Sequence, residues 1–405
     1  MRHAVHRAWT RVARGAIAPL LVACALAGCS ADRAPHRYLA ITHSAIDRVS
    51  FFDLDRRAVV GVLPTQKLPH DMLLSGDDRT LYVVNAGGQC ISTYDLGSAA
   101  LWHTAHAFMA RDTGKVTRGR ARGIASLPPG IEHHHLTAPE FPERAAAVHA
   151  RVGAIGHQAC TDCHDRSVGA KPFAPAFIDG GHAIRLVHLD ARDVTTLDAT
   201  TLAVRRRVPL ALPVEFTPIE AWARPGSDTA FVTCRDSIGR HRPGIVAVID
   251  LKTGACVKRI VPGIYPWHLV PSPDGRSLYV NDFQSARVSV VDIARAEVTD
   301  SLTAENGPAG ILPIEGGQAL LVSCFYTHRV VILDLGTRTV RRRFDVGSNP
   351  TMMLPADDGS RVWVLCGGES ELQQLDLRSG RVVERHVLPF GAYAMTLVPG
   401  RARAS

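Results

Sequence analysis

The sequence predicts an all-β protein: a seven-bladed β-propeller closed by its C-terminal strand, with a small, mainly helical insert. Three observations support this prediction: a 42-residue period, four strand-like runs in each period, and a spare strand-like run at the C-terminus. A repeat architecture also accommodates a chain of 405 residues without division into several compact domains.

The period is marked by a strand that ends in aspartate and an apolar residue. The motif appears as SFFDL, STYDL, TTLDA, AVIDL, VVDI, VILDL and QQLDL, with its aspartates at Asp53, Asp95, Asp198, Asp250, Asp292, Asp334 and Asp376. The successive intervals between these positions are 42, 103, 52, 42, 42 and 42 residues. One interval therefore carries 61 extra residues (103 − 42) and another carries 10 (52 − 42).

Each unit contains four short runs with strand and turn chemistry. An apolar run such as LYVVN or LLVSC comes first, and the run that ends in aspartate follows; a third run such as VVGVLP precedes one introduced by proline, as in NPTMML. Short β-branched runs bounded by Gly, Asp and Pro are typical of strands. Seven such units predict blades that bury their faces against their neighbours. A generic β-sandwich has no reason to keep a constant period.

Strands such as YVVN resemble those of the bacterial YVTN-type propeller family. The resemblance covers residues 38–399, apart from an insert at 111–170. It implies how the ring closes, because the first unit begins at YLAITHS without its proline strand and the chain ends with a spare one, LPFGAYAMTLVPG. We expect that spare strand to complete the first blade.

The N-terminus is typical of an export signal. A segment with four arginines and no acid precedes the apolar run AIAPLLVACALAGCS. The end of that run, Leu26 to Cys29, resembles a bacterial lipobox, so we expect residues 1–28 to be removed, Cys29 to be lipidated and 29–37 to be a linker. Ser30 implies the periplasmic side of the outer membrane. The alternative is an ordinary signal peptide and a soluble periplasmic protein.

Charge does not indicate a nucleic-acid partner. Removal of the four signal-peptide arginines lowers the formal net charge from +8 to +4. The basic runs AVRR and VRRRF lie near the ends of expected strands, where charged residues are typical of solvated edges.

Cysteine usage does not indicate a disulfide framework. Five cysteines remain outside the signal peptide, the lipobox and one motif discussed below, and three of them share one place in FVTC, LVSC and WVLC. We expect these three to be small, buried strand residues.

The motif HQACTDCHD, residues 157–165, indicates one covalent haem c. Cys160 and Cys163 supply thiols one helical turn apart for the two vinyl groups, and His164 follows directly as an iron ligand. Zinc would need a second ligand pair, which the sequence lacks, and a thioredoxin-like pair would need a βαβ context. Export is consistent with haem c, which is attached outside the cytoplasm.

The second axial ligand is assigned by resemblance to bis-histidine multihaem cytochromes. In those proteins a histidine about a dozen residues before the first cysteine binds iron, which implies His149, eleven residues before Cys160. His157 is close to the motif and less suited to fold back. The triplet His133 to His135 and Met109 remain alternatives.

Both departures from the period are expected on one face of the ring. The large insert connects one blade to the proline strand of the next, and DSIGRHRPG connects the first and second strands of its unit. The proline strand begins on that face and lines the channel. The second residue after each proline gives the channel positions Asp71, Ala174, Glu220, His268, Gly310, Met352 and Gly391.

Four channel positions could bind a metal or a polar small molecule: Asp71, Glu220, His268 and Met352, next to His70 and Trp267. An ordinary polar tunnel mouth is the alternative. Together with the haem motif, these residues predict an exported electron-transfer protein with a redox partner protein and a membrane anchor. In one form of this prediction, the protein is the cytochrome component of an oxidoreductase that acts on a small molecule at the channel mouth.

Two further interpretations bear on function. The haem-c/haem-d nitrite reductases are similar in outline only, because their haem domain precedes the propeller. A surface-anchored binding or scaffold protein with structural or sensory haem remains the alternative. The sequence contains no nucleophile elbow, phosphate loop or dinucleotide fingerprint that would indicate a hydrolase, kinase or dehydrogenase.

Overall fold

The protein is described by a computed structural model. It describes residues 37–99, 101–102, 171–189, 191–224, 226–237, 242–356 and 359–399, and the backbone of 131–135. In these parts of the chain, no helix is both long and apolar enough to cross a membrane.

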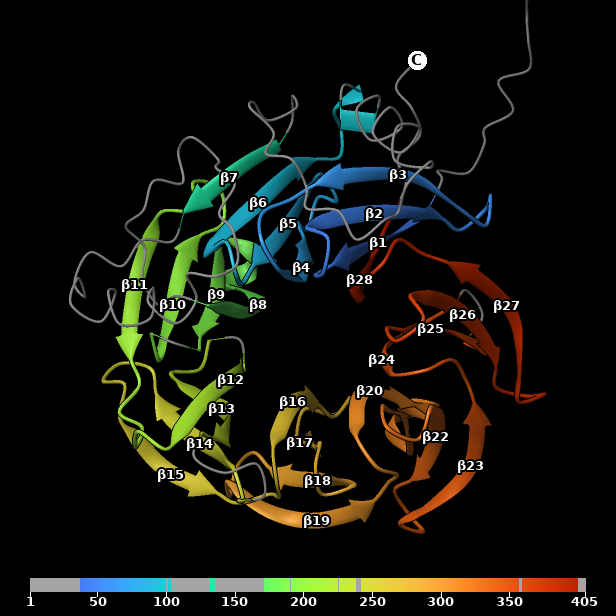
Figure 1. Ribbon diagram of the computed structural model, residues 1–405. Helices are drawn as coiled ribbons and strands as arrows, with labels where there is room; N and C mark the ends of the chain where they lie inside the picture. The colour runs from blue at the N-terminus through green and yellow to red at the C-terminus, as the bar shows by residue number, and fades with distance from the viewer. Residues whose placement is uncertain are drawn as a thin grey trace, which may run out of the picture.

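The strands of the described residues form seven four-stranded antiparallel sheets around a central channel (Figure 1). From the channel outwards, the first three blades are β28 (Ala392–Val398), β1 (Tyr38–His43), β2 (Arg48–Asp53) and β3 (Ala58–Pro64); β4 (Pro69–Leu74), β5 (Thr80–Asn85), β6 (Cys90–Asp95) and β7 (Ile131–His135); and β8 (Pro172–Ile178), β9 (Ala183–His188), β10 (Asp193–Asp198) and β11 (Val204–Pro209).

The other four blades follow in chain order. They are β12 (Phe216–Trp222), β13 (Thr229–Asp236), β14 (Ile245–Asp250) and β15 (Cys256–Ile260); β16 (Pro266–Pro271), β17 (Ser277–Asp282), β18 (Arg287–Asp292) and β19 (Glu297–Thr303); β20 (Pro308–Ile314), β21 (Ala319–Cys324), β22 (Arg329–Asp334) and β23 (Thr339–Asp345); and β24 (Pro350–Pro355), β25 (Arg361–Cys366), β26 (Glu371–Asp376) and β27 (Arg381–Val387).

The ring closes through strands from the two ends of the propeller. β28 pairs antiparallel with β1, with Tyr38 opposite Val398 and Ile41 opposite Met395. The C-terminal strand therefore completes the first blade, and the expectation of an all-β seven-bladed propeller is confirmed.

The hydrophobic core consists of seven clusters, and each lies between two neighbouring blades. Between blades 1 and 2, for example, Phe51 and Val49 pack with Leu81 and Val83, and all four are fully buried. The remaining junctions follow the same plan. Apolar burial is therefore spread evenly round the ring, as expected of a structure in which each repeat contacts only its neighbours.

The repeated aspartates act as turn formers. Asp376 Oδ1 accepts hydrogen bonds from the backbone N–H groups of Arg378 and Ser379, at 3.0 and 2.7 Å. All seven make the same kind of contact where the third strand of a blade ends. The most regular feature of the sequence is thus structural, because an Asx side chain replaces the backbone partners that a tight turn lacks.

The expected insert at 111–170 is interrupted by a propeller strand. Residues Ile131–His135 form β7, which pairs with β6 as the outermost strand of blade 2, so the described part of this range is strand and not helix (Figure 1). The extra residues therefore divide into 96–130, between β6 and β7, and 136–171, between β7 and β8. The outer strand of a blade pairs with one neighbouring strand only, here β6. Because it lies within the extra residues, the 42-residue period did not reveal it.

The described cysteines form no disulfide. Cys324 and Cys366 end the second strand of their blades, Cys234 lies two residues before the end of its strand, and all three are fully buried, as expected. Burial raises the pKa of the Cys324 and Cys366 thiols to about 12, so both remain protonated and unreactive.

Candidate functional site

A recurring β-bulge places side chains at the mouth of the channel. In β4 the register with β5 shifts between Pro69 and Met72, so His70 and Asp71 leave the regular pleat. The other proline strands shift at the corresponding place. A bulge of this kind re-aims side chains, and in β4, β8, β12 and β16 two residues of each strand line the channel mouth.

Six of the seven expected channel positions lie two residues after the first proline of their innermost strands, and the register moves the seventh. In the closing strand the shift lies between Met395 and Ala392, so Ala394 corresponds to Asp71, and Gly391 lies in the turn before the strand. Counting from Pro389 gave the wrong residue, because Pro389 lies three residues before the first residue of β28 and does not begin the strand.

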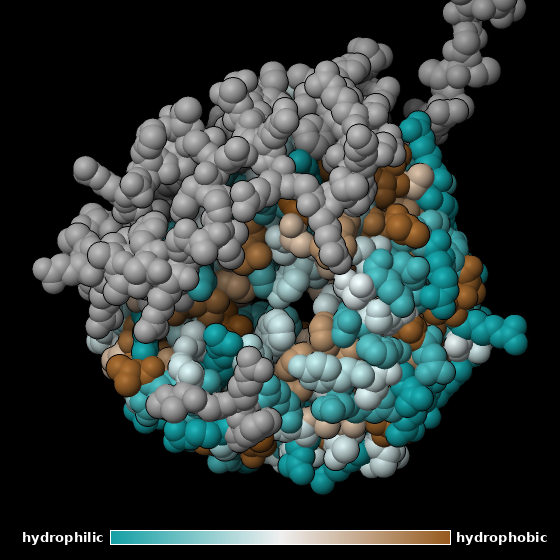
Figure 2. All heavy atoms as spheres, in the orientation of Figure 1, coloured by the Kyte–Doolittle hydropathy of each residue, from teal (hydrophilic) through white to brown (hydrophobic). Residues whose placement is uncertain are grey.

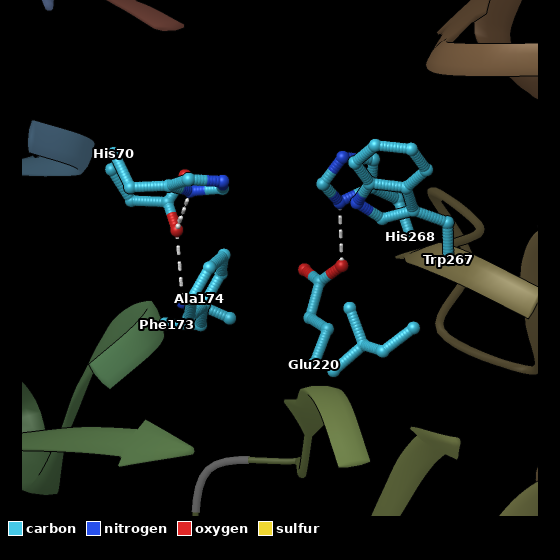
Figure 3. Close-up of a pocket in the computed structure, with 8 residues that line it drawn as sticks. His70, Phe173, Ala174, Glu220, Trp267 and His268 are labelled. Carbon is cyan, nitrogen blue, oxygen red and sulfur yellow. Dashed lines mark hydrogen bonds and ion pairs between the residues drawn. The ribbon is translucent and has the colours of Figure 1, made fainter. Parts of the chain in front are cut away.

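Four neighbouring blades enclose a cavity of about 40 Å³ at this mouth. Two residues from each of β4, β8, β12 and β16 line it: His70, Asp71, Phe173, Ala174, Ile219, Glu220, Trp267 and His268. In Figure 3, His70 and the pair of Glu220 and His268 lie on opposite sides. We call it the mouth cavity; Figure 2 shows the channel opening at the centre of the ring.

On one side, Glu220 joins two blades. Its Oε2 atom accepts a hydrogen bond from His268 Nδ1 at 2.8 Å and one from the Leu269 N–H at 3.3 Å. The His268 N–H is held by Asn281 Oδ1 at 2.6 Å, and the Trp267 ring stacks on the imidazole with centroids 5.5 Å apart. The imidazole is therefore oriented by a carboxylate on one ring nitrogen and an indole on its face.

On the other side, His70 and Asp71 form a second imidazole–carboxylate contact. His70 Nδ1 lies 3.1 Å from Asp71 Oδ2, which also accepts the Ala174 N–H at 2.9 Å. The His70 ring lies between the rings of Phe173 and Tyr393, with centroids 4.1 and 4.0 Å away. These tilted ring contacts leave His70 only 7% exposed.

Asp71 also compensates for a missing contact between blades. At four other junctions a polar side chain near the end of the second strand donates to the backbone of the next blade, as Thr42 Oγ1 does to the His70 carbonyl at 2.9 Å and Ser323 Oγ to the Thr351 carbonyl at 3.0 Å. At the junction of blades 2 and 3 the corresponding residue is Val84. The Asp71 carboxylate and the Ala174 N–H make the junction there instead.

The mouth cavity has a negative electrostatic potential. Burial lowers the pKa of His268, but the charge and hydrogen bond of Glu220 and the charge of Asp71 outweigh it, so the pKa is raised. Burial also opposes ionisation of Asp71, yet the His70 charge and hydrogen bond and the Ala174 N–H hold its pKa below the usual range. The pKa of the Tyr393 phenol is raised well above its usual value by burial, then by Asp71, Tyr265 and Glu220. A proton is therefore favoured on His268 while Asp71 stays ionised.

Met352 does not join the other three proposed channel residues. Its sulfur accepts the Met395 N–H at 3.4 Å, and its side chain packs against the core between blades 7 and 1. Gly310 is also structural, because a Cβ there would collide with the Thr351 carbonyl of the next blade. The structure thus brings Asp71, Glu220 and His268 together and leaves Met352 outside the cavity.

Phe173, Ile219 and Tyr393 contribute to this region but were not expected from the sequence. The first two occupy the position of His70 in their own strands, so reading the first residue after each proline would have found them. Tyr393 could not be found that way because of the displaced proline in the closing strand.

Strand register decides which face carries each part of the extra chain. Pro172 at the start of β8 lies opposite His188 at the end of β9, and Phe216 at the start of β12 lies opposite Asp236 at the end of β13. The connections 136–171 and 237–244 therefore join the propeller on the face of the mouth cavity. The segment 96–130 joins strands whose linked ends lie on the opposite face, since Asp95 lies opposite Thr80.

The expected haem, lipid and export residues lie outside the described residues: Cys29, Met109, His149, His157, Cys160, Cys163 and His164. The backbone of His133 to His135 belongs to β7, at the outer edge of blade 2. The described residues contain no group of three or more His, Cys, Asp or Glu side chains arranged to hold a metal ion.

No protein family and no curated protein matches the sequence of this chain. Solved structures match its fold. The periplasmic gluconolactonase PpgL of Pseudomonas aeruginosa is 15% identical, with a TM-score of 0.59 over 90% of this chain and 100% of that one. Hydrazine synthase of Kuenenia stuttgartiensis is also 15% identical, with a TM-score of 0.58 over 84% of this chain and 92% of that one.

A third similar structure is the dihydro-haem d1 dehydrogenase NirN in complex with DHE. It is 14% identical, with a TM-score of 0.54 over 86% of this chain and 63% of that one. At these identities the likeness shows the fold alone, and it supports the seven-bladed propeller.

Proposed function

We propose that this chain is an exported electron-transfer protein of the YVTN propeller type that carries one covalent haem c. The observation that supports the proposal most strongly is the order Cys160, Cys163, His164 within the connection 136–171, which leads directly into β8. β8 then supplies Phe173 and Ala174 to the mouth cavity.

The donor set fits haem c in its chemistry. Cys160 and Cys163 would form the two thioether bonds, His164 would bind the iron, and His149 would bind it from the other side. When bound, the haem would supply one-electron transfer. The roles of these four residues rest on their order and spacing in the sequence, and we propose that the segment that carries them is small and mainly helical.

Covalent geometry limits how far the haem motif can lie from the mouth cavity. His164 and Ala174 are ten residues apart in the sequence, and each residue spans at most about 3.6 Å, so their separation is at most about 36 Å. The motif is thus tethered to the propeller by the strand that lines the cavity. We propose that electrons pass between the haem and a redox partner protein, and that a small molecule binds at the cavity.

The channel residues can supply binding and proton transfer. His268 is oriented through Nδ1 by Glu220, as in sites where an imidazole accepts and releases protons, and Asp71 stays ionised opposite it. If the bound molecule is oxidised or reduced there, the protein is an oxidoreductase. We further propose that Cys29 is lipidated and anchors the protein on the periplasmic side of the outer membrane.

The test is haem analysis of the full-length protein exported from a host that has haem-attachment machinery. The wild-type protein should retain haem through acidified solvent extraction and give a c-type pyridine haemochrome spectrum. The double variant Cys160→Ala, Cys163→Ala should release all of it, while Cys256→Ala, outside the motif, should retain it. A wild-type protein without covalent haem would overturn the proposal.

A further inference from the structure

We infer that the mouth cavity binds a small ammonium-type cation, such as ammonium or a short primary ammonium ion. This deepens the proposed function, because it names the class of molecule at the channel mouth. It rests on the cavity itself and does not require haem.

The size of the cavity limits the ligand to very few atoms. One water-sized group needs about 10–15 Å³ on the same measure, so a cavity of about 40 Å³ holds about three such groups. A sugar ring, a nucleotide or a haem edge is too large. The ligand must therefore bind through charge and hydrogen bonds, since it offers little apolar surface to bury.

The two carboxylates that line the cavity have only imidazoles as counter-charges, Glu220 with His268 and Asp71 with His70. Its ionisable residues are two carboxylates and two imidazoles, without a lysine or arginine. Glu220 is balanced by His268 when that imidazole is protonated. Asp71 stays ionised, and its imidazole partner His70 lies 3.1 Å away, so a bound cation would complete the charge balance whenever that imidazole is neutral.

Two groups at the cavity already respond to this negative potential. His268 holds its proton more tightly than a free imidazole although burial opposes the charge, and Tyr393 resists ionisation partly because Asp71 and Glu220 lie near it. The same potential would stabilise any other cation that fits.

The walls match an N–H donor on a cation. The side chains of Asp71 and Glu220 are 24% and 23% exposed, so their carboxylates can accept from a bound N–H group. His70 is 7% exposed, and its Nδ1 lies 3.1 Å from Asp71 Oδ2, so this imidazole holds the carboxylate at the cavity. Trp267 and Phe173 add aromatic rings, whose faces attract cations.

A divalent metal fits this site less well than an ammonium ion. The four ionisable side chains belong to blades on opposite sides of the cavity, and the described residues include no cluster with metal-binding geometry. An ammonium ion differs because its N–H groups make directed hydrogen bonds to separate acceptors and require no closed ligand shell.

The test is isothermal titration calorimetry on the full-length protein at pH 7.5, with methylammonium chloride as the ligand. Methanol is a neutral control of equal heavy-atom count, sodium is a control for charge, and tetramethylammonium is a control for size. Methylammonium should bind at least about tenfold more tightly than any of the three.

Asp71→Asn is the key variant. It keeps an oxygen that can accept the Ala174 N–H but removes the charge, so it should weaken methylammonium binding about tenfold or more. Asp345→Asn, at a side chain that is 86% exposed at the end of the outermost strand of blade 6 and does not line the cavity, should bind as the wild type does. Glu220→Gln provides a second loss of charge if Asp71→Asn does not fold.

Several outcomes would overturn the inference: equal binding of methanol or tetramethylammonium, full binding by Asp71→Asn and Glu220→Gln, or tight binding of Zn²⁺ that displaces methylammonium. The variant Cys160→Ala, Cys163→Ala separates this inference from the haem proposal. This variant should bind methylammonium as the wild type does. If the wild-type protein carries no covalent haem but still binds methylammonium, only the proposed function is contradicted.

Discussion

Asp282→Asn should stabilise the propeller at alkaline pH and much less in acid. Asp282 ends β17, is fully buried, and accepts a hydrogen bond from Ser289 Oγ at 2.7 Å through Oδ2. Its Oδ1 has no partner among the described residues. Burial raises the pKa to about 7, against the opposing effects of Ser289 and Arg287.

The sign of the pH effect follows from which state binds more protons. Between about pH 4 and pH 7 the folded protein keeps the Asp282 proton and the unfolded chain releases it, so stability falls as pH rises through this range. A change of one pKa unit corresponds to about 1.4 kcal/mol, so a difference of about 3 corresponds to about 4 kcal/mol above pH 7. About 3 kcal/mol of this develops between pH 5 and pH 8.

The second blade shows that asparagine suits this position. Asn85 corresponds to Asp282, and its Nδ2 donates to Ser92 Oγ at 2.8 Å in the place of the contact between Asp282 and Ser289. Asp282→Asn is therefore neutral at every pH and can keep a hydrogen bond to Ser289.

Urea denaturation of the wild type and Asp282→Asn at pH 5 and pH 8 measures the effect. The gain in free energy of unfolding should be larger at pH 8 by up to about 3 kcal/mol. Asp345→Asn, on an exposed ion pair with Arg329, should change stability by at most about 1 kcal/mol at either pH. An equal effect of Asp282→Asn at both pH values would refute the assignment of a raised pKa.

Three other predictions concern the site, the ring and the haem. Glu220→Gln should lower the pKa of His268 in a ¹H NMR titration. In the wild type the ion pair adds stability below about pH 6.5, and this stability is lost as pH rises through the raised pKa of His268. The variant should lack this pH-dependent stability. Ser323→Ala removes the acceptor of the Gly310 N–H and the donor to the Thr351 carbonyl, so it should cost about 1–3 kcal/mol in thermal or urea unfolding, while the exposed Ser301→Ala should cost little. His149→Ala should convert a low-spin haem spectrum to high-spin and admit carbon monoxide; an unchanged spectrum would transfer the ligand role to His133, His134, His135 or Met109.

The sequence alone was enough to predict the propeller and most of its channel residues. A 42-residue period requires a repeated unit, and turn-forming aspartates such as Asp376 and strand-starting prolines such as Pro69 recur because the same local geometry recurs in each blade. Local chemistry of this kind depends on residues close together in the chain. The channel positions of Asp71, Glu220 and His268 followed from counting along that period.

Only the tertiary structure decided where the irregular parts lie. Ile131–His135 became the outer strand of blade 2 through pairing with β6, from which it is separated by residues 96–130. The channel position in β28 belongs to Ala394 and not to Gly391, because the register of β28 is set by its pairing with β1, more than 340 residues away in the chain. Met352 occupies a channel position by count, yet its side chain packs into the core between blades 7 and 1. Strand pairing, register and side-chain packing depend on contacts between distant segments, and a local pattern carries no record of them.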